Sequence, residues 1–341
     1  MRVLVTGGAG YIGSHTAKAL AAAGHVPVSL DTLERGYSWA VRWGPLVRAD
    51  LGDRTALDAA LSEHRIEAVI HFAAYAYVGE SMAHPDRYFR NNVAGTLNLL
   101  EALRARGVGA LVFSSSCATY GLPSRVPIAE GEAQLPVNPY GESKLMAERM
   151  IAWYARAYGF AATALRYFNA AGADPDGELG EAHEPETHLI PLAIAAAQGR
   201  VPRLEIYGTD YPTGDGTAVR DYVHVTDLAD AHVRALERPG PEGAMRVYNV
   251  GAGRGASVRE VVATVERVGG REVPLVESGR RSGDPPVLLA LVDKAERELG
   301  WRPVRSSLEA IVQSAWGWHT RDQSGNYPGG KGQPAPPVAL R

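Results

Sequence analysis

A tyrosine and a lysine four residues apart form the clearest candidate for proton-transfer chemistry in this chain. Asn138 followed by Pro139 predicts the start of a helix, because asparagine caps a helix N-terminus and proline fits its first position. Tyr140 and Lys144 would then lie on one face of that helix. A free tyrosine has a pKa of about 10, so forming a phenolate near pH 7 requires roughly 4 kcal/mol of stabilisation. The helix dipole and the Lys144 charge would both act in that direction.

A serine run, Ser114 to Ser116, ends a predicted strand that begins near Ala110. Ligands of doubly wound parallel sheets bind beyond the carboxyl ends of the strands, so Ser116 could hydrogen-bond a reacting hydroxyl. Taken alone, such a run is more often a turn or a helix cap, and Tyr-x-x-x-Lys arises by chance in many helices. These residues indicate a catalytic set only when they occur together with a nucleotide-binding motif.

That motif consists of three glycines directly after the first apolar strand. Gly7 would allow a sharp turn, Gly10 a close approach of a pyrophosphate, and Gly13 tight packing of the following helix, whose free N–H groups attract phosphate. Asp31 stands at the end of the second predicted strand, where a carboxylate would accept hydrogen bonds from the adenosine ribose. Because Asp31 would repel a 2′-phosphate, the pattern predicts NAD rather than NADP.

Short apolar runs alternate with Ala-rich stretches through the first half of the chain, which is typical of βα units. The sequence predicts an α/β fold with a doubly wound, Rossmann-type parallel sheet and a smaller mixed α/β region after it. We expect an NAD-binding domain over residues 1–172, returning in part later, a second domain over 173–320 that mainly binds the substrate, and a mobile tail over 321–341. Expected strands cover 3–5, 26–30, 68–72, 110–114 and 162–166; expected helices cover 11–23, 88–106 and 139–158; a long loop covers 173–187.

Composition excludes several classes of function. The formal net charge is −3 and no Lys/Arg-rich block occurs, so we expect no nucleic-acid partner. No apolar stretch reaches the roughly 20 residues that cross a bilayer, and the first residues contain no signal-peptide core. Cys117 is the single cysteine, which excludes an intrachain disulfide and a cysteine zinc site. We therefore expect a cytoplasmic protein.

Together these motifs resemble the extended short-chain dehydrogenase/reductase superfamily and, within it, the UDP-glucose (UDP-galactose) 4-epimerase family. The resemblance runs from Met1 to about Trp318 and includes the segments His71-Phe72-Ala73-Ala74, Val78-Gly79-Glu80-Ser81, Asn91-Asn92-Val93, Ser114-Ser115-Ser116, Asn138-Pro139-Tyr140-Gly141, Arg166 to Gly172 and Val219 to Val225.

The resemblance implies an isomerase in which bound NAD is regenerated within each cycle. Tyr140 would remove the proton of the sugar 4-hydroxyl while hydride leaves C4. The resulting 4-keto sugar would rotate about its diphosphate linkage and take the hydride back on its other face. Lys144 would hold the nicotinamide ribose and, with the nicotinamide charge, lower the Tyr140 pKa, while Ser116 steers the proton.

The family pattern also implies which residues bind the two ligands. Cofactor-binding positions are Gly7, Gly10, Tyr11, Ile12, Gly13, Asp31, Asp50, Leu51, Phe72, Ala73, Ala74, Asn91, Ser114, Tyr140, Lys144 and Tyr167. Substrate-binding positions, for UDP-glucose and UDP-galactose, are Ser116, Tyr140, Asn169, His188, Leu189, Tyr207, Arg220, Arg281, Asp284 and Leu288. In this scheme Tyr207 lies against the uracil and Arg281 on the diphosphate, because planar guanidinium donors suit phosphate. A homodimer, packed through helices 88–106 and 140–158, is also implied.

Three positions depart from the best-known family pattern. Ala76 stands where many relatives have a lysine near the cofactor phosphate. His188 replaces an asparagine that touches substrate, and its side chain either bonds the nucleotide or caps a helix; we weigh these equally. Leu288 occupies a position whose bulk influences acceptance of N-acetylated sugars, so we favour the unmodified hexoses.

A histidine-rich segment next to this site invites a metal-binding interpretation. His183 and His188 alternate with Glu181, Glu184 and Glu186, but their spacing fits no compact ligand set and Pro185 would interrupt a shared helix. We predict no metal site here. Cys117 is expected to pack as a small residue, since no base-orienting triad accompanies it.

Other functions compete with the principal interpretation. A nucleotide-sugar 4,6-dehydratase needs an Asp-Glu pair after the serine or threonine, whereas here Cys117, Ala118 and Thr119 follow Ser116. A 4-epimerase of UDP-N-acetylhexosamines or of UDP-xylose and UDP-arabinose would share the catalytic set and differ in pocket volume. A non-catalytic NAD-binding sensor would usually lack the tyrosine that is present at 140.

Overall fold

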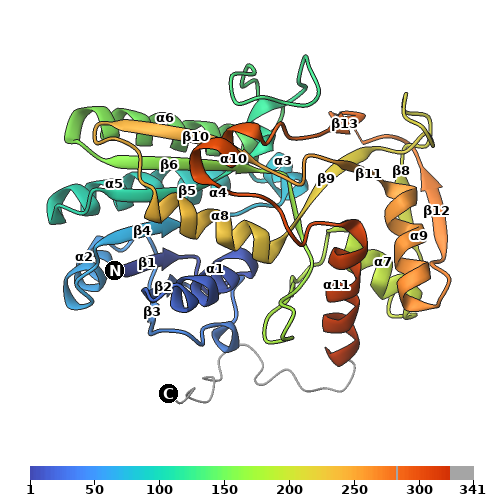
Figure 1. Cartoon of the computed structure of the whole chain (residues 1–341), viewed down its shortest axis with the longest axis horizontal. Helices are drawn as coiled ribbons and strands as arrows, with labels where there is room; N and C mark the ends of the chain where they lie inside the picture. Colours follow the sequence, from blue (N-terminus) through green and yellow to red (C-terminus); the bar gives the residue numbers. More distant parts are fainter. Residues whose placement is uncertain (282, 323–341) are drawn as a thin grey trace.

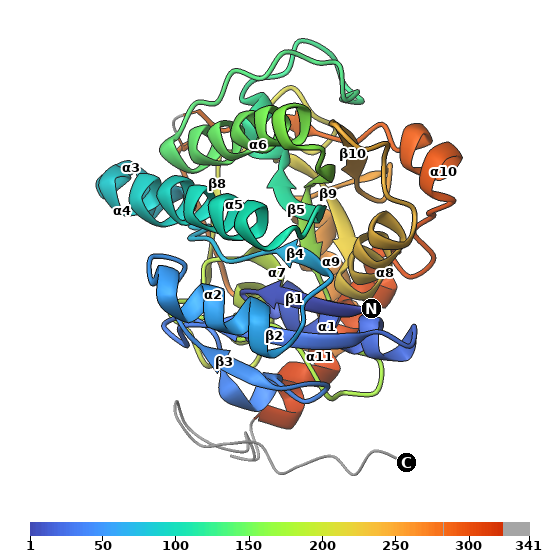
Figure 2. The same cartoon turned by 90° about the vertical axis from the view of Figure 1, so that its left-hand side faces the viewer.

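A seven-stranded parallel sheet is the centre of the computed structural model, which describes residues 1–281 and 283–322. Its strand order is β10-β6-β5-β4-β1-β2-β3. Both faces of the sheet are covered by helices (Figure 2), which explains why its strands consist mainly of apolar residues. The strands are β1 (Arg2–Thr6), β2 (Val26–Asp31), β3 (Leu46–Arg48), β4 (Ala68–His71), β5 (Ala110–Ser116), β6 (Ala161–Tyr167) and β10 (Ala244–Val250).

Alternate residues of β1 belong to two separate cores, one on each face. Leu4 packs with helices α2 (Arg54–Glu63), α5 (Gly95–Arg106) and α6 (Pro139–Tyr158). Val3 and Val5 pack on the other face with α1 (Tyr11–Ala22), α8 (Val225–Glu237) and α10 (Asp293–Leu299). The two cores together anchor the carboxyl ends of the strands, where the predicted site lies.

A smaller lobe, seen at the right of Figure 1, has its own apolar core between α7 (Leu189–Ala197), α9 (Val258–Gly269) and α11 (Leu308–Asp322). Two small sheets border it. One has the order β11-β9-β13, with β7 beside β9, and the other pairs β12 with β8. Their strands are β7 (Asn169–Ala171), β8 (Leu204–Tyr207), β9 (Val219–His224), β11 (Gly255–Ser257), β12 (Leu275–Ser278) and β13 (Val287–Leu288).

Short helical segments connect these parts. They are the 3₁₀ helices η1 (Ser38–Ala40) and η3 (Cys117–Tyr120), the helices α3 (Val78–Ala83) and α4 (Pro85–Tyr88), and the π-helix η2 (Phe89–Ala94), which runs into α5. No helix in the described part of the chain is long and apolar enough to cross a membrane.

The predicted fold class is confirmed, and the predicted strands and helices fall where expected to within a few residues. The helix expected over 88–106 differs, because it passes through the π-helix before α5 begins. The elements β3 and α2 were not predicted. Residues 173–187 contain no helix or strand, as expected. The tail predicted over 321–341 lies outside the described residues, except for the last two residues of α11.

Candidate active site

The N-terminus of α6 presents the predicted proton-transfer pair. The side chain of Asn138 accepts a hydrogen bond from the Gly141 N–H at 2.8 Å, and Pro139 fills the first turn, so the predicted cap is confirmed. Tyr140 borders the cleft in that first turn, and Lys144 is buried one turn later. The Lys144 ammonium donates a hydrogen bond of 2.8 Å to the Ser114 carbonyl oxygen at the end of β5.

Burial dominates the titration of both groups. It lowers the pKa of Lys144 to about 7, against the opposing charge of Glu148. It raises the pKa of Tyr140 to about 12, although a hydrogen bond with Ser116 lowers it. Without a cofactor, burial therefore outweighs the Ser116 hydrogen bond. The expected phenolate also depends on the charge of the nicotinamide, so it stays a prediction.

A buried ion pair fixes α6 against the sheet directly behind this pair. Arg166 on β6 donates to both carboxylate oxygens of Glu148, at 2.9 and 2.6 Å. Ser115 on β5 donates to the same carboxylate at 2.5 Å, and Arg166 also donates to the Tyr120 hydroxyl at 3.0 Å. Bidentate pairing of this kind holds geometry tightly. It sets the position of the α6 N-terminus relative to the end of β5, where Ser116 lies.

The glycine motif forms a cradle that fits a dinucleotide. Gly7 has φ +71°, and a Cβ there would lie 2.8 Å from the Ala73 nitrogen. A Cβ on Gly13 would lie 2.2 Å from the Gly7 carbonyl oxygen, so both positions require glycine. Gly10, the N-cap of α1, has no side-chain cap, and a Cβ on it would meet only the Gly7 carbonyl oxygen. The α1 N-terminus therefore faces the cleft with its backbone donors available to a pyrophosphate.

Asp31 lies at the end of β2, as predicted, with its carboxylate held by the backbone. One oxygen accepts from the Ala9 N–H at 3.0 Å and the other from the Leu33 N–H at 2.9 Å. Burial raises the Asp31 pKa, and these two hydrogen bonds lower it. The carboxylate is thus oriented at the edge of the cleft where a ribose would lie.

All residues predicted for the site line one cleft of about 940 Å³ between the large sheet and the smaller lobe. The space suits a dinucleotide and a nucleotide sugar together, since ligand pockets typically range from about 300 to 1,000 Å³. The cleft is also lined by residues that the sequence analysis did not identify, among them Arg35, Tyr37, Trp39, Tyr77 and Glu205. The first four of these residues lie in the segments that follow β2 and β4. Because ligands bind beyond the carboxyl ends of parallel strands, that position in the sequence indicates a role in the site.

At the end of the cleft predicted to bind the sugar nucleotide, two of the predicted residues, Arg281 and Tyr207, contact each other. The Arg281 guanidinium lies 4.0 Å from the centroid of the Tyr207 ring, which was expected to face uracil. Arg220 on β9 donates to the backbone carbonyl oxygens of Val219 and Pro285, each at 2.9 Å. Leu288 is its partner on β13. This end of the cleft is therefore built from short strands and loops.

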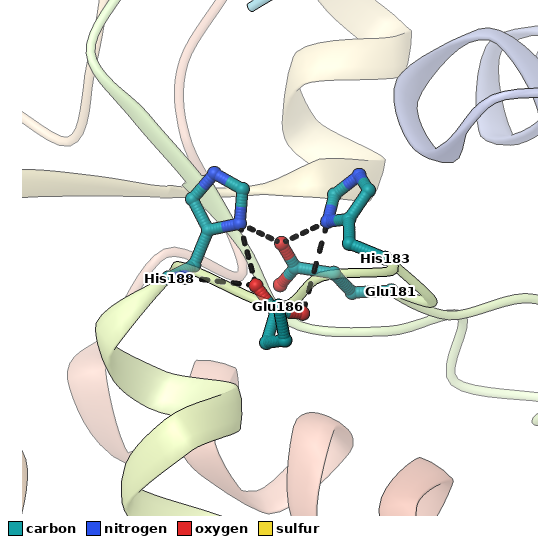
Figure 3. A group of neighbouring side chains, drawn as sticks. All are labelled: Glu181, His183, Glu186 and His188. Atoms are coloured by element: carbon teal, nitrogen blue, oxygen red, sulfur yellow. Dashed lines mark hydrogen bonds and ion pairs between the residues drawn. The ribbon is translucent and has the colours of Figure 1, made fainter. Parts of the chain in front are cut away.

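His188 does not cap α7. It occupies the N-cap position but makes no side-chain cap hydrogen bond, so that interpretation is wrong. Its Nδ1 lies 2.9 Å from a carboxylate oxygen of Glu181 and 2.9 Å from one of Glu186. His183 Nδ1 approaches the same two carboxylates (Figure 3). The expectation that these residues form no compact set is also wrong, because an extended loop rather than a helix brings them together.

These carboxylates change the titration of both imidazoles. Burial lowers the pKa of each histidine, but the contacts with Glu181 and Glu186 prevail and raise the pKa of His183 to about 9 and that of His188 to about 10. Cys117, by contrast, packs beside Tyr120 and Ile128, and burial raises its pKa to about 12. A thiol of this kind does not support nucleophilic catalysis.

The fold and this cleft define a nucleotide-binding enzyme of a known class. The chain belongs to the NAD dependent epimerase/dehydratase family, whose sequence profile matches residues 3–251. It is 50% identical over 323 residues to the UDP-glucose 4-epimerase of Rhizobium meliloti (strain 1021), covering 95% of this chain and 98% of that protein.

Two solved structures are similar over nearly the whole chain. One is UDP-glucose 4-epimerase from Brucella ovis in complex with NAD, with 54% identity and a TM-score of 0.90, covering 93% of this chain and 98% of that one. The other is UDP-glucose 4-epimerase from Stenotrophomonas maltophila with bound NAD and formylated UDP-arabinopyranose, with 39% identity and a TM-score of 0.92, covering 95% and 99%.

Proposed function

We propose that this protein interconverts UDP-galactose and UDP-glucose with NAD as a retained cofactor. The observation that carries the proposal is the convergence, in one cleft, of the glycine cradle with Ser116, Tyr140 and Lys144. The names of the similar proteins favour this activity over a dehydratase or a sensor. The residues that those alternatives would change, Cys117 to Thr119 and Tyr140, are also of the epimerase type. N-acetylated or pentose sugars remain the alternative substrates of the same chemistry.

Tyr140 is the proposed acid and base. NAD, when bound, supplies the group that accepts the C4 hydride and returns it. Tyr140 takes the proton of the sugar 4-hydroxyl as C4 is oxidised, and gives a proton back when C4 is reduced, so no net redox change occurs. Ser116 lies within hydrogen-bonding distance of the phenol and is proposed to orient the reacting hydroxyl.

Lys144 is proposed to hold the nicotinamide ribose and to stabilise the Tyr140 phenolate. Because burial lowers its pKa to about 7, its charge depends on nearby negative groups, and Glu148 on the next turn supplies one. The cofactor's positive charge would then complete the stabilisation that Tyr140 lacks within the protein alone.

The proposed binding residues fall into two groups, one at the cofactor end of the cleft and one at the sugar end. We propose that Asp31 bonds the adenosine ribose and that Arg220 and Arg281 bind the diphosphate of the sugar nucleotide. For Tyr207 to face uracil, the Arg281 guanidinium must leave its ring, and the diphosphate would provide the competing partner. The side chain of Leu288 is proposed to limit the space beside the sugar. The other cofactor- and substrate-binding positions implied by the family pattern are proposed to keep those roles.

We also propose a cytoplasmic homodimer, with residues 1–172 and the returning β10 binding NAD and residues 173–320 mainly binding the sugar nucleotide. The exposed side chain of Trp153 on α6 supports packing through α5 and α6. Light scattering at micromolar concentration tests the dimer, and a monomeric mass would contradict it.

The experiment that tests the activity is incubation of the purified protein with UDP-galactose and no added NAD, following the anomeric protons by NMR. Appearance of UDP-glucose up to a constant ratio is the expected result. No change in a preparation that releases NAD on denaturation would contradict the proposal, and would favour another sugar or the sensor.

A further inference from the structure

Two histidines and two glutamates converge in the loop that leads into α7. Glu181, His183, Glu186 and His188 each direct one ligand atom to a common point, and these atoms all lie within 4.8 Å of one another (Figure 3). Both histidines present the same ring nitrogen, Nδ1. The proposed epimerisation uses none of the four as an acid or base.

Each histidine nitrogen lies close to both glutamates, and the two histidines face different oxygens of Glu186. His183 Nδ1 lies 3.1 Å from Glu181 Oε1 and 3.7 Å from Glu186 Oε2. His188 Nδ1 lies 2.9 Å from Glu181 Oε1 and 2.9 Å from Glu186 Oε1. Four ligands at the usual zinc distances, arranged tetrahedrally, lie about 3.4 Å apart. Small movements of the side chains would therefore admit one ion.

One nitrogen of the cluster is not explained by ion pairing alone. His183 Nδ1 is shielded from solvent, yet it makes no hydrogen bond despite the two carboxylates beside it. Figure 3 shows this nitrogen facing one oxygen of Glu181 and one of Glu186. Buried polar atoms usually find a well-aligned partner, so this nitrogen, set between two carboxylates, is a candidate ligand atom.

The surroundings hold the ligands in place. Glu186 Oε1 accepts hydrogen bonds from the backbone N–H groups of Thr187 and His188, at 2.7 and 2.8 Å. The His183 ring stands edge-on to the rings of Tyr11 and Tyr77, each with a centroid distance of 6.1 Å. Fixed outer contacts of this kind are typical of metal sites.

We propose that Glu181, His183, Glu186 and His188 bind one divalent transition-metal ion, with zinc as the best match. Imidazole nitrogens exclude the harder Ca²⁺ and Mg²⁺, and two carboxylates neutralise a double charge. Four protein ligands leave no open position, so the ion is structural. It fastens the 181–188 loop against Tyr11 of the cofactor cradle. The inference does not rest on the proposed activity, although His188 is also one of the proposed substrate-binding residues.

The test begins with protein stripped by a chelator, with its NAD content checked afterwards. The stripped protein is titrated with Zn²⁺ against a chromophoric competitor, and separately with Co²⁺ while the visible absorption is recorded. We expect about one ion per chain and a Co²⁺ spectrum of four-coordinate type.

Variants then locate the site. His183→Gln should weaken zinc binding at least about 100-fold, and Glu186→Gln should also weaken it, because each removes one ligand. His64→Gln, at the C-cap of α2, is the matched control and should bind as the unsubstituted protein does. Unchanged NAD content and a cooperative melt show that each variant is folded.

Several results would overturn the proposal. Fewer than about 0.1 zinc ions per chain at micromolar free Zn²⁺, with no Co²⁺ absorption, means that the cluster is only a set of ion pairs. Equal affinity in His183→Gln, Glu186→Gln and the control places the ion elsewhere. If the substituted chains do not fold, the Co²⁺ spectrum of the unsubstituted protein decides.

Discussion

The two ends of the cleft are built by different means. The cofactor end uses backbone groups and glycines at the ends of long, buried strands, where a side chain at Gly7 or Gly13 would collide with the main chain. The sugar end uses side chains on short strands and loops, such as Arg220 on β9 and Arg281 after β12. Ligand contacts at the first end are fixed by the sheet, whereas those at the second can rearrange. Substitutions at the two ends should therefore have different effects, on NAD binding at the cofactor end and on substrate binding at the sugar end.

The largest effect is expected at the junction of the two ends. Tyr140→Phe removes the only proposed proton acceptor and keeps the ring, so turnover should fall at least about 1,000-fold. NAD content, measured after denaturation, should not change. Tyr154→Phe on the same helix is a matched control and should remain active. Retained turnover in the Tyr140→Phe variant would contradict the assignment of Tyr140 as the acid and base.

A somewhat smaller loss is expected for Lys144→Met, which preserves the length of the buried stem. Turnover should fall by about 100-fold or more, and NAD should dissociate more readily, because this one group is proposed to serve both the ribose and Tyr140. Steady-state rates together with fluorescence titration of NAD measure the two effects. A change in only one of them would show that Lys144 serves a single role.

At the sugar end, Arg281→Ala should raise KM by about 10- to 100-fold with little change in NAD content. The guanidinium now stacked on Tyr207 is proposed to move to the diphosphate, and a lysine cannot reproduce its planar pair of donors. Arg281→Lys should accordingly recover only part of the affinity. Equal KM values for all three proteins would contradict the diphosphate contact.

The smallest effect is expected at the cofactor end. Asp31→Asn keeps the size of the side chain but removes its charge, so NAD affinity should fall about 10-fold and NADP should bind measurably better. Equilibrium titrations with both dinucleotides provide the measurement. An unchanged preference for NAD would mean that other residues exclude the 2′-phosphate.

The sequence predicts those parts of the site whose structure is determined by residues close together in the chain. The α6 cap requires only Asn138 and Pro139, and the cradle only the spacing of its glycines, so both follow from neighbouring residues. The return of β10 to the edge of the large sheet depends on pairing with β6, which is distant in sequence. Such pairing leaves no local pattern, so the expected later return of the NAD-binding domain was not assigned to particular residues.

Features that depend on distant parts of the chain escape this kind of reasoning. Burial by elements far apart in the chain raises the pKa of Tyr140 in the protein without a cofactor, and the residues next to it in sequence do not reveal that burial. The cluster of Glu181, His183, Glu186 and His188 looked scattered because helical spacing was used to judge it. An irregular loop follows no such period, and only its course in space brings the four side chains together.

The most direct test of the central claim uses UDP-galactose carrying deuterium at C4, incubated with the purified protein in ordinary water without added NAD. We expect UDP-glucose that keeps its deuterium at C4, because the transferred deuteride would stay with the bound cofactor and return to the same carbon. Loss of the label to solvent, or conversion only when NAD is added in stoichiometric amounts, would contradict it.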